Sequence, residues 1–119
     1  MKSISFSLLS LFFAGIINAQ TNIKLEEVGR HIGDSVTVCG KVSDLRYFET
    51  SKNQPTFLNI GDRFPRQLLT VVIWGTVRSQ FKEKIEDLKD KHICITGRIQ
   101  LYKEKPEIVI GDPAQISVQ

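Results

Sequence analysis

Residues 35–48 constrain the fold most strongly, because their side chains alternate between apolar and polar over an unusually long run. Val36, Val38 and Val42 share one phase, and polar side chains fill most of the other. Such alternation is typical of a β-strand with one buried face and one solvated face. The run exceeds the roughly five or six residues of an average strand, and Gly40 inside it predicts a bend or a bulge. A long, bent strand of this kind favours a small barrel.

Four further strands are predicted from β-branched or alternating runs that are bounded by turns. The polar segment 49–55 is expected to form a loop, and Arg63 to Arg66 a turn. A charged turn is expected from Lys103 to Pro106. The predicted strands are 56–60, 68–74, 92–102 and 107–110.

Two helices are predicted. Segment 23–32 has acidic residues early and Gly33 after its end, which suits a short helix. Segment 77–89 has one apolar stripe at helical spacing and charged residues elsewhere, so it predicts a single amphipathic helix. The stripe consists of Val77, Phe81, Ile85 and Leu88.

The predicted order after the first helix is strand, strand, strand, helix, strand, strand. A meander with one amphipathic helix must bury the apolar stripe of the helix against the open end of the sheet. This is the arrangement of the OB-fold, an all-β, five-stranded Greek-key barrel with a helix between strands three and four. The sequence therefore predicts an OB-fold barrel.

Three segments also resemble a known group of proteins. They read VTVCGKV at 36–42, FLNIGDRFPRQLLTVVIW at 57–74 and ICITGRIQLYKEKPEIVIGDPAQI at 93–116. They are similar to exported bacterial OB-fold domains of the nucleic-acid-binding superfamily that includes tRNA-anticodon domains. The resemblance covers residues 33–118. It implies a binding surface on the second and third strands, bordered by the loop after strand one and the loop between strands four and five.

Cations and aromatic rings gather in these regions. Single-stranded nucleic acid is held by cations that follow the phosphates and by flat rings on which bases stack. We expect Phe57, Trp74 and Phe81 to pack in the core or against the helix, because they lie on or beside apolar stripes. For Phe64, the alternative to stacking on a base is packing over the end of the barrel. The candidate binding residues are Arg46, Tyr47 and Lys52 at the first loop, Arg63, Phe64 and Arg66 in the turn between strands two and three, and Tyr102, Lys103 and Lys105 in the last loop.

Two of these expectations leave alternatives open. The turn with Arg63 and Arg66 either joins the other two loops or lies at the opposite end of the barrel. Cys39 and Cys94 occupy the polar phase of the first and fourth strands, which are antiparallel neighbours in an OB barrel. They either form a disulfide or remain two free cysteines.

The first nineteen residues predict export. Lys2 is their only charge, and residues 4–17 contain no ionisable side chain. Fourteen residues span about 21 Å as a helix, short of the roughly 30 Å hydrocarbon core of a bilayer. We therefore expect residues 1–19 to be a signal peptide rather than a permanent membrane anchor, and residues 20–119 to be a single periplasmic or extracellular domain.

The remaining composition excludes several functions. Sixteen basic against thirteen acidic residues give a net charge of +3, too small an excess for a protein that coats polyanions. His31 and His92 stand alone, without zinc-ligand spacing or a neighbouring acid, and no nucleophile motif is present. The acidic and arginine residues of an OB-fold nuclease site are imitated only loosely, by Asp44, Asp62, Arg63 and Arg66. We expect no metal, no cofactor and no enzymatic activity.

The sequence thus predicts an exported OB-fold binding module whose partner is single-stranded DNA or RNA, or a similar oligomeric anion. The alternative is a periplasmic envelope protein that binds a protein or a small ligand through the same barrel, without nucleic acid. The acidic residues among the loop lysines predict weak binding.

Overall fold

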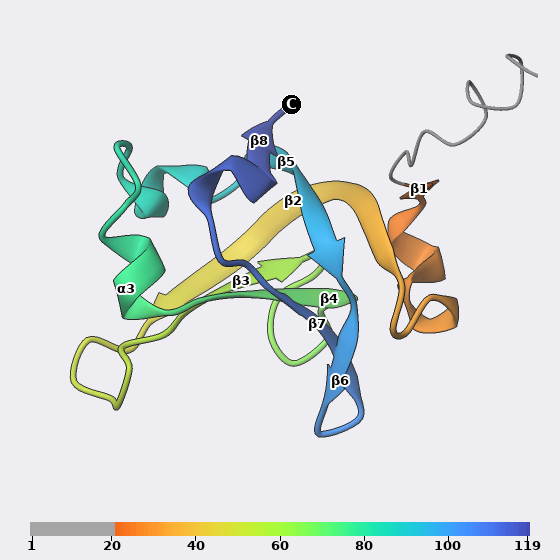
Figure 1. Cartoon of the computed structure of the whole chain (residues 1–119), viewed down its shortest axis with the longest axis horizontal. Coiled ribbons are helices and arrows are strands. Elements are labelled where there is room, and N and C mark those ends of the chain that lie inside the picture. The colour runs from red at the N-terminus through yellow and green to blue at the C-terminus, as the bar shows by residue number, and fades with distance from the viewer. Residues whose placement is uncertain (1–20) are drawn as a thin grey trace, which may run out of the picture.

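The structure is a computed structural model, and it describes residues 21–119 (Figure 1). The predicted signal peptide lies outside the described residues. The elements are, in chain order, β1 (Thr21–Ile23), η2 (Leu25–Arg30), β2 (Ser35–Tyr47), β3 (Thr56–Ile60), β4 (Leu69–Ile73), α3 (Gly75–Arg78), η3 (Ile85–Leu88), β5 (His92–Arg98), β6 (Gln100–Tyr102), β7 (Lys105–Val109), η4 (Pro113–Gln115) and β8 (Ile116–Val118), where η marks a 3-10 helix.

The strands form one curved sheet around a single core. Their order is β6-β7-β4-β3-β2-β5-β8, and β1 adds to β2 in parallel. The long strand β2 serves both halves of the barrel: residues 35–41 pair with β5, and residues 42–47 pair with β3 (Figure 1). Strands β4 and β7 pair in parallel, as the third and fifth strands of an OB barrel do.

Segment 92–102 completes the barrel by bending at Ile99. Before the bend β5 pairs with β2, and after it β6 pairs with β7. Ile99 is fully buried, and its N–H donates to the Asp34 carbonyl at 3.0 Å while its own carbonyl accepts from the Gly33 N–H at 2.7 Å. The predicted all-β OB-fold barrel is confirmed, with the fourth predicted strand divided in two at Ile99.

The core follows the predicted alternation of the strands. Because successive side chains of a strand point to opposite faces, one phase of each strand lies inside the barrel. The fully buried side chains include Val36, Val38 and Val42 of β2, Leu58 and Ile60 of β3, Leu69, Val71 and Ile73 of β4, Ile93 and Ile95 of β5, and Ile108 of β7.

Gly40 does not form the bulge that was one of the two predicted alternatives. The register of the β2–β3 ladder shifts between Val42 and Asp44, so the bulge lies two residues or more after the glycine. A Cβ atom on Gly40 would lie 2.6 Å from Cγ2 of Ile60 and 2.9 Å from Cδ2 of Leu25. Gly40 is therefore needed for close packing inside the barrel.

The prediction of one amphipathic helix over 77–89 is wrong. Helix α3 has four residues, and turns join it to the short 3-10 helix η3. After α3 the Gln80 N–H donates to the Val77 carbonyl instead of the Thr76 carbonyl. The Thr76 carbonyl accepts from Ser79 Oγ at 3.0 Å and from Gln80 Nε2 at 3.2 Å. Side chains that compete for the acceptors of the helix in this way favour its end.

The apolar stripe of this segment is nevertheless buried. Val77 and Ile85 belong to the core, and Phe81 and Leu88 pack against it. The broken segment therefore still covers the barrel, as the predicted helix was expected to do. Among residues 21–119, no helix is long and apolar enough to cross a membrane.

Cys39 and Cys94 form a disulfide. The two residues are direct partners in the β2–β5 ladder, and Ser117 of β8 is the partner of Cys94 on the other side. The bridge joins positions 55 residues apart in the sequence. Of the two alternatives that the sequence left open, the structure has the disulfide.

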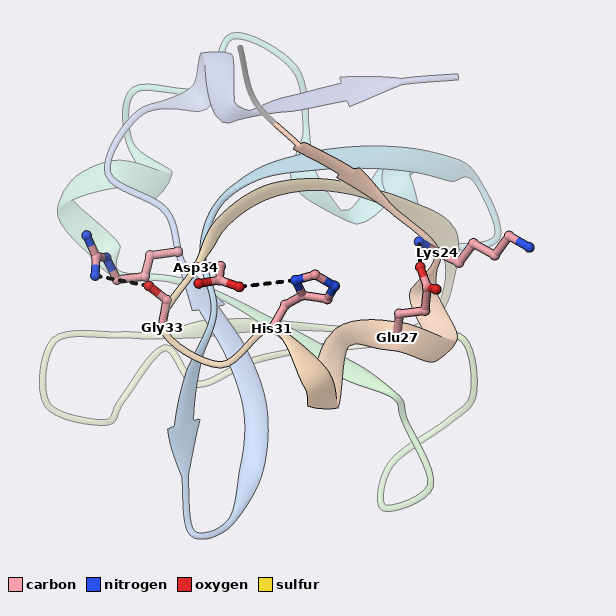
Figure 2. Close-up of polar contacts among 6 residues, drawn as sticks. Lys24, Glu27, His31, Gly33 and Asp34 are labelled. Atoms are coloured by element: carbon pink, nitrogen blue, oxygen red, sulfur yellow. Dashed lines mark hydrogen bonds and ion pairs between the residues drawn. The ribbon is translucent and has the colours of Figure 1, made fainter. Parts of the chain in front are cut away.

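The segment before β2 is a 3-10 helix instead of the expected helix over 23–32 (Figure 2). The Lys24 backbone N–H donates to Glu27 Oε1 at 2.9 Å, and this bond lowers the pKa of the Glu27 carboxyl. His31 Nδ1 lies 3.1 Å from Asp34 Oδ2, so His31 does have an acid beside it, contrary to expectation. Figure 2 shows both contacts at the exposed edge of the barrel.

Candidate functional site

A groove of about 360 Å³ lies on the outer face of the barrel. Strands β3, β4 and β7 form its floor, and its walls come from the end of β2, the loop between β3 and β4, and the β6–β7 hairpin. The lining residues are Arg46, Phe48, Phe57, Asn59, Phe64, Gln67, Thr70, Tyr102, Lys103, Lys105, Pro106 and Glu107.

The first wall consists of stacked aromatic and cationic side chains. Phe57 lies on β3 in the phase opposite to the buried Leu58, so its ring is directed outwards. The rings of Phe48 and Phe57 have centroids 5.4 Å apart and a tilt of 60°. The guanidinium carbon of Arg46 lies 5.3 Å from the centre of the Phe48 ring. These contacts hold a cation beside two aromatic faces.

The second wall has two exposed rings and two lysines. Phe64 and Tyr102 are 64% and 58% exposed, which is unusual for large apolar side chains. Lys103 Nζ lies 5.4 Å from the centre of the Tyr102 ring. Lys105 Nζ donates to the Pro65 carbonyl at 2.8 Å, so the β6–β7 hairpin is bonded to the β3–β4 loop.

The groove brings together five of the nine candidate binding residues. They are Arg46, Phe64, Tyr102, Lys103 and Lys105. Phe64 lines the groove together with Tyr102, so the β3–β4 turn and the β6–β7 hairpin meet there. The exposure of Phe64 means that it does not cover the end of the barrel as the packing alternative required.

The other four candidates lie outside the groove lining. Tyr47 packs its ring under the Arg78 guanidinium, whose carbon lies 3.7 Å from the ring centre. Arg66 Nε lies 3.6 Å from Asp62 Oδ2. Lys52 is exposed in the loop after β2, and Arg63 is exposed in the β3–β4 loop.

The polar residues of the groove floor and Phe57 of the first wall are not among the candidates that the sequence predicted. Phe57 was expected in the core, but it lines the groove. Trp74, expected to pack, is 38% exposed, whereas Phe81 packs against the core as expected. The alternation of β3 is the signal that identifies Phe57 and Asn59, because both share the phase opposite to Leu58.

Polar residues form one continuous line across the floor. Asp44, Asn59, Thr70, Glu107 and Gln100 are successive cross-strand partners on β2, β3, β4, β7 and β6. We call these five residues the polar row. Neighbouring side chains in such a line lie close enough to interact. Asn59, Thr70 and Glu107 line the groove, and Asp44 and Gln100 are the ends of the row.

Hydrogen bonds connect most of the polar row. Asn59 Nδ2 donates to Asp44 Oδ1 at 2.6 Å, and Thr70 Oγ1 donates to Asn59 Oδ1 at 3.3 Å. Gln67 Nε2 donates to Thr70 Oγ1 at 3.0 Å. At the other end, Gln100 Nε2 donates to Glu107 Oε1 at 2.9 Å.

The groove is thus aromatic at its walls, cationic at its rim and polar on its floor. Arg46, Lys103 and Lys105 carry positive charge, and Glu107 carries the acidic charge among the lining residues. In the described part of the chain, no group of three or more His, Cys, Asp or Glu side chains could hold a metal ion. The arrangement suits recognition of a flat, anionic ligand.

The barrel and its groove define a class: OB-fold domains with a binding face on the second and third strands of the barrel. The model of the OB-fold nucleic acid binding domain of the tRNA anticodon type matches residues 36–112. The chain belongs to this family. No curated protein matches the chain.

Solved structures are similar in fold. Entamoeba histolytica asparaginyl-tRNA synthetase has a TM-score of 0.57 and 21% identity over 86% of this chain and 24% of its own. A yeast Stn1 and Ten1 structure has a TM-score of 0.62 and 10% identity over 88% of this chain and 65% of its own. An OBody bound to hen egg-white lysozyme has a TM-score of 0.53 and 16% identity over 87% of this chain and 97% of its own. The chain spans about a quarter of the synthetase.

Proposed function

We propose that this domain binds single-stranded nucleic acid in the groove. One observation carries the proposal: exposed Phe64 and Tyr102 face a groove that also contains Arg46, Lys103 and Lys105. Bases of a single strand are free to stack on such rings, and its phosphates are attracted to the cations. Membership in the OB-fold nucleic acid binding family supports the same function.

Two contributions to the binding free energy are expected, one from stacking and one from charge. Stacking on an aromatic side chain contributes about 1–3 kcal/mol per base. Each phosphate that a lysine or arginine neutralises makes log K fall with log salt by about 0.7 for single strands. Glu107 opposes the phosphates, so the stacking contribution is expected to dominate at physiological salt.

The test is fluorescence anisotropy with fluorescent 15-nucleotide dT and rU strands over a series of salt concentrations. Tyr102→Ala is expected to weaken binding about 5-fold or more, because a stacking face is lost. Lys103→Gln is expected to reduce the salt slope by about 0.7. Lys82→Gln with Lys84→Gln is the matched control, since both lysines are exposed and lie outside the groove lining.

Two results would contradict the proposal. One is the absence of binding to any oligonucleotide at low salt. The other is equal weakening by the groove variants and the Lys82 and Lys84 control. The first result would favour the alternative, a protein or small-ligand partner for the same barrel. The second would place nucleic acid binding outside the groove.

The proposal includes export of the domain. The apolar run 4–17 supports it, and so does the Cys39–Cys94 disulfide, because disulfides persist in oxidising compartments. Bacterial cells that express the full chain are expected to hold the domain outside the cytoplasm, with thiols that maleimide labels only after reduction. Deletion of residues 4–17 is expected to leave it in the cytoplasm. A full chain that stays cytoplasmic with free thiols would contradict export.

A further inference from the structure

We infer that the polar row, together with the adjoining Gln67, selects the base that enters the groove and prefers guanine. The inference rests on the proposed function and deepens it, because it assigns a base preference to the same groove. The observations that carry it are the direction of the hydrogen bonds along the row and the two acceptors that those bonds leave free.

The direction of the hydrogen bonds starts from Asp44. A carboxylate only accepts hydrogen bonds, so the NH₂ group of Asn59 is directed at Asp44 and its Oδ1 is directed at Thr70. The Thr70 hydroxyl donates its one hydrogen to Asn59, and it must therefore accept from Gln67. This fixes the amide of Gln67 with Nε2 towards Thr70 and leaves Oε1 as the free end.

Gln67 Oε1 is the first free acceptor. The Oε1 atom is buried and has no hydrogen-bond partner. The Gln67 residue as a whole is half-buried and lines the groove. A buried acceptor without a partner is unfavourable. A ligand N–H that approaches the groove floor beside Gln67 would give this acceptor a partner.

Glu107 supplies the second free acceptor. Gln100 donates to its Oε1, and within residues 21–119 no donor bonds its Oε2. Glu107 lies directly across from Thr70 in the β4–β7 ladder, and Gln67 donates to the same Thr70. Both free acceptors are thus next to Thr70 at the groove floor.

Two acceptors on residues that both neighbour Thr70 match the edge of one base. The Watson–Crick edge of guanine presents N1–H and the N2 amino group side by side, both as donors. Uracil and thymine present one N–H between two carbonyl oxygens, which face a carboxylate unfavourably. Adenine and cytosine present one amino group beside an unprotonated ring nitrogen. Guanine is therefore the base that donates to both Gln67 and Glu107.

This assignment also accounts for a carboxylate in a groove for a polyanion. Glu107 repels phosphates and weakens binding that depends on charge alone. A carboxylate that accepts from base N–H groups forms charge-assisted hydrogen bonds. The walls of Phe57, Phe64 and Tyr102 provide the stacking faces that hold a base against the floor.

The experiment compares 15-nucleotide dT strands that carry a single central dG, dA, dC or dT. A single dG prevents guanine strands from associating with one another. We expect the dG strand to bind about tenfold more tightly than the all-dT strand, with dA and dC between them. Glu107→Gln is expected to reduce the ratio of dG to dT affinity to about twofold or less, because the variant loses the charged acceptor at the groove floor.

Glu104→Gln is the matched control. Glu104 is exposed at the tip of the same hairpin, outside the groove lining, and the variant loses the same charge. It is expected to keep the tenfold preference. A second variant, Gln67→Met, removes the other acceptor at similar size and is expected to lower the ratio of dG to dT affinity to about threefold or less.

The outcomes separate the inference from the proposed function. Equal binding of all four strands overturns the inference and leaves the proposed function standing. A guanine preference that survives Glu107→Gln also overturns the inference. The absence of binding to every strand overturns the proposed function, and the inference with it.

Discussion

At the residue scale, two glycines show how closely side chains pack against the backbone inside the barrel. A Cβ on Gly40 would lie 2.6 Å from Cγ2 of Ile60, and a Cβ on Gly97 would lie 2.6 Å from Cγ2 of Ile108. Both glycines occupy the inward phase of paired strands. Isoleucine side chains from across the barrel fill the space that a β-carbon would need, so these positions cannot accept a methyl group without movement of the core.

Gly40→Ala is therefore expected to destabilise the protein by about 1–3 kcal/mol. Urea unfolding followed by circular dichroism measures the change. Gly29→Ala is the control, because a Cβ there meets no atom within 4 Å, and its effect is expected to stay within about 0.5 kcal/mol. Equal effects of the two substitutions would contradict the packing role of Gly40.

The broken segment from α3 to η3 is held to the barrel through one arginine. Arg78 Nη1 donates to Thr56 Oγ1 at 2.9 Å, and Nη2 donates to Glu86 Oε2 at 2.7 Å. In one straight helix, Arg78 and Glu86 would be separated by about 12 Å along the axis. The ion pair therefore stabilises the fold-back of this segment and joins it to β3.

The acid dependence of stability is expected to depend on this ion pair. Burial alone would raise the pKa of Glu86, but the hydrogen bond and charge of Arg78 outweigh it and lower the pKa below the ordinary value of 4.5. A carboxyl with a lowered pKa stabilises the fold above its ordinary pKa, and this stabilisation is lost as the pH falls through the lowered value.

Glu86→Gln is thus expected to be less stable than the unmodified chain at pH 7, by about 1 kcal/mol for a partly exposed charged hydrogen bond. The difference in the free energy of unfolding between the variant and the unmodified chain should narrow as the pH falls below 4.5. Thermal unfolding from pH 3 to pH 8 measures it. Asp87→Asn, an exposed neighbour on η3, serves as the control, and the same pH profile for both variants would contradict the assignment.

At the scale of the whole molecule, the barrel was predictable because the alternation of apolar and polar side chains is visible within each single strand. The inward phases of β2, β3, β4 and β5 are visible in consecutive residues, and the structure buries them. The strands β1 and β8 have three residues each, too few to show periodicity. The helix prediction failed because side-chain bonds to Thr76 and the distant partner of Arg78 outweighed a regular apolar spacing.

The groove was only partly predictable, because it depends on pairing between distant strands. Loop cations and rings such as Lys103 and Tyr102 could be located from composition and from the resemblance. The polar row could not, since Asp44, Thr70 and Gln100 become neighbours only through the register of five strands. The disulfide likewise required the register that sets Cys39 opposite Cys94.

The alternation along β3 also has a practical consequence for engineering. Leu58 and Ile60 fill the interior, whereas Phe57 and Asn59 occupy the opposite phase of the strand and line the groove on the outer face. A combinatorial library at Phe57 would therefore change the groove without altering the interior. Asn59 would be kept, because it is buried and hydrogen-bonded to Asp44 and Thr70.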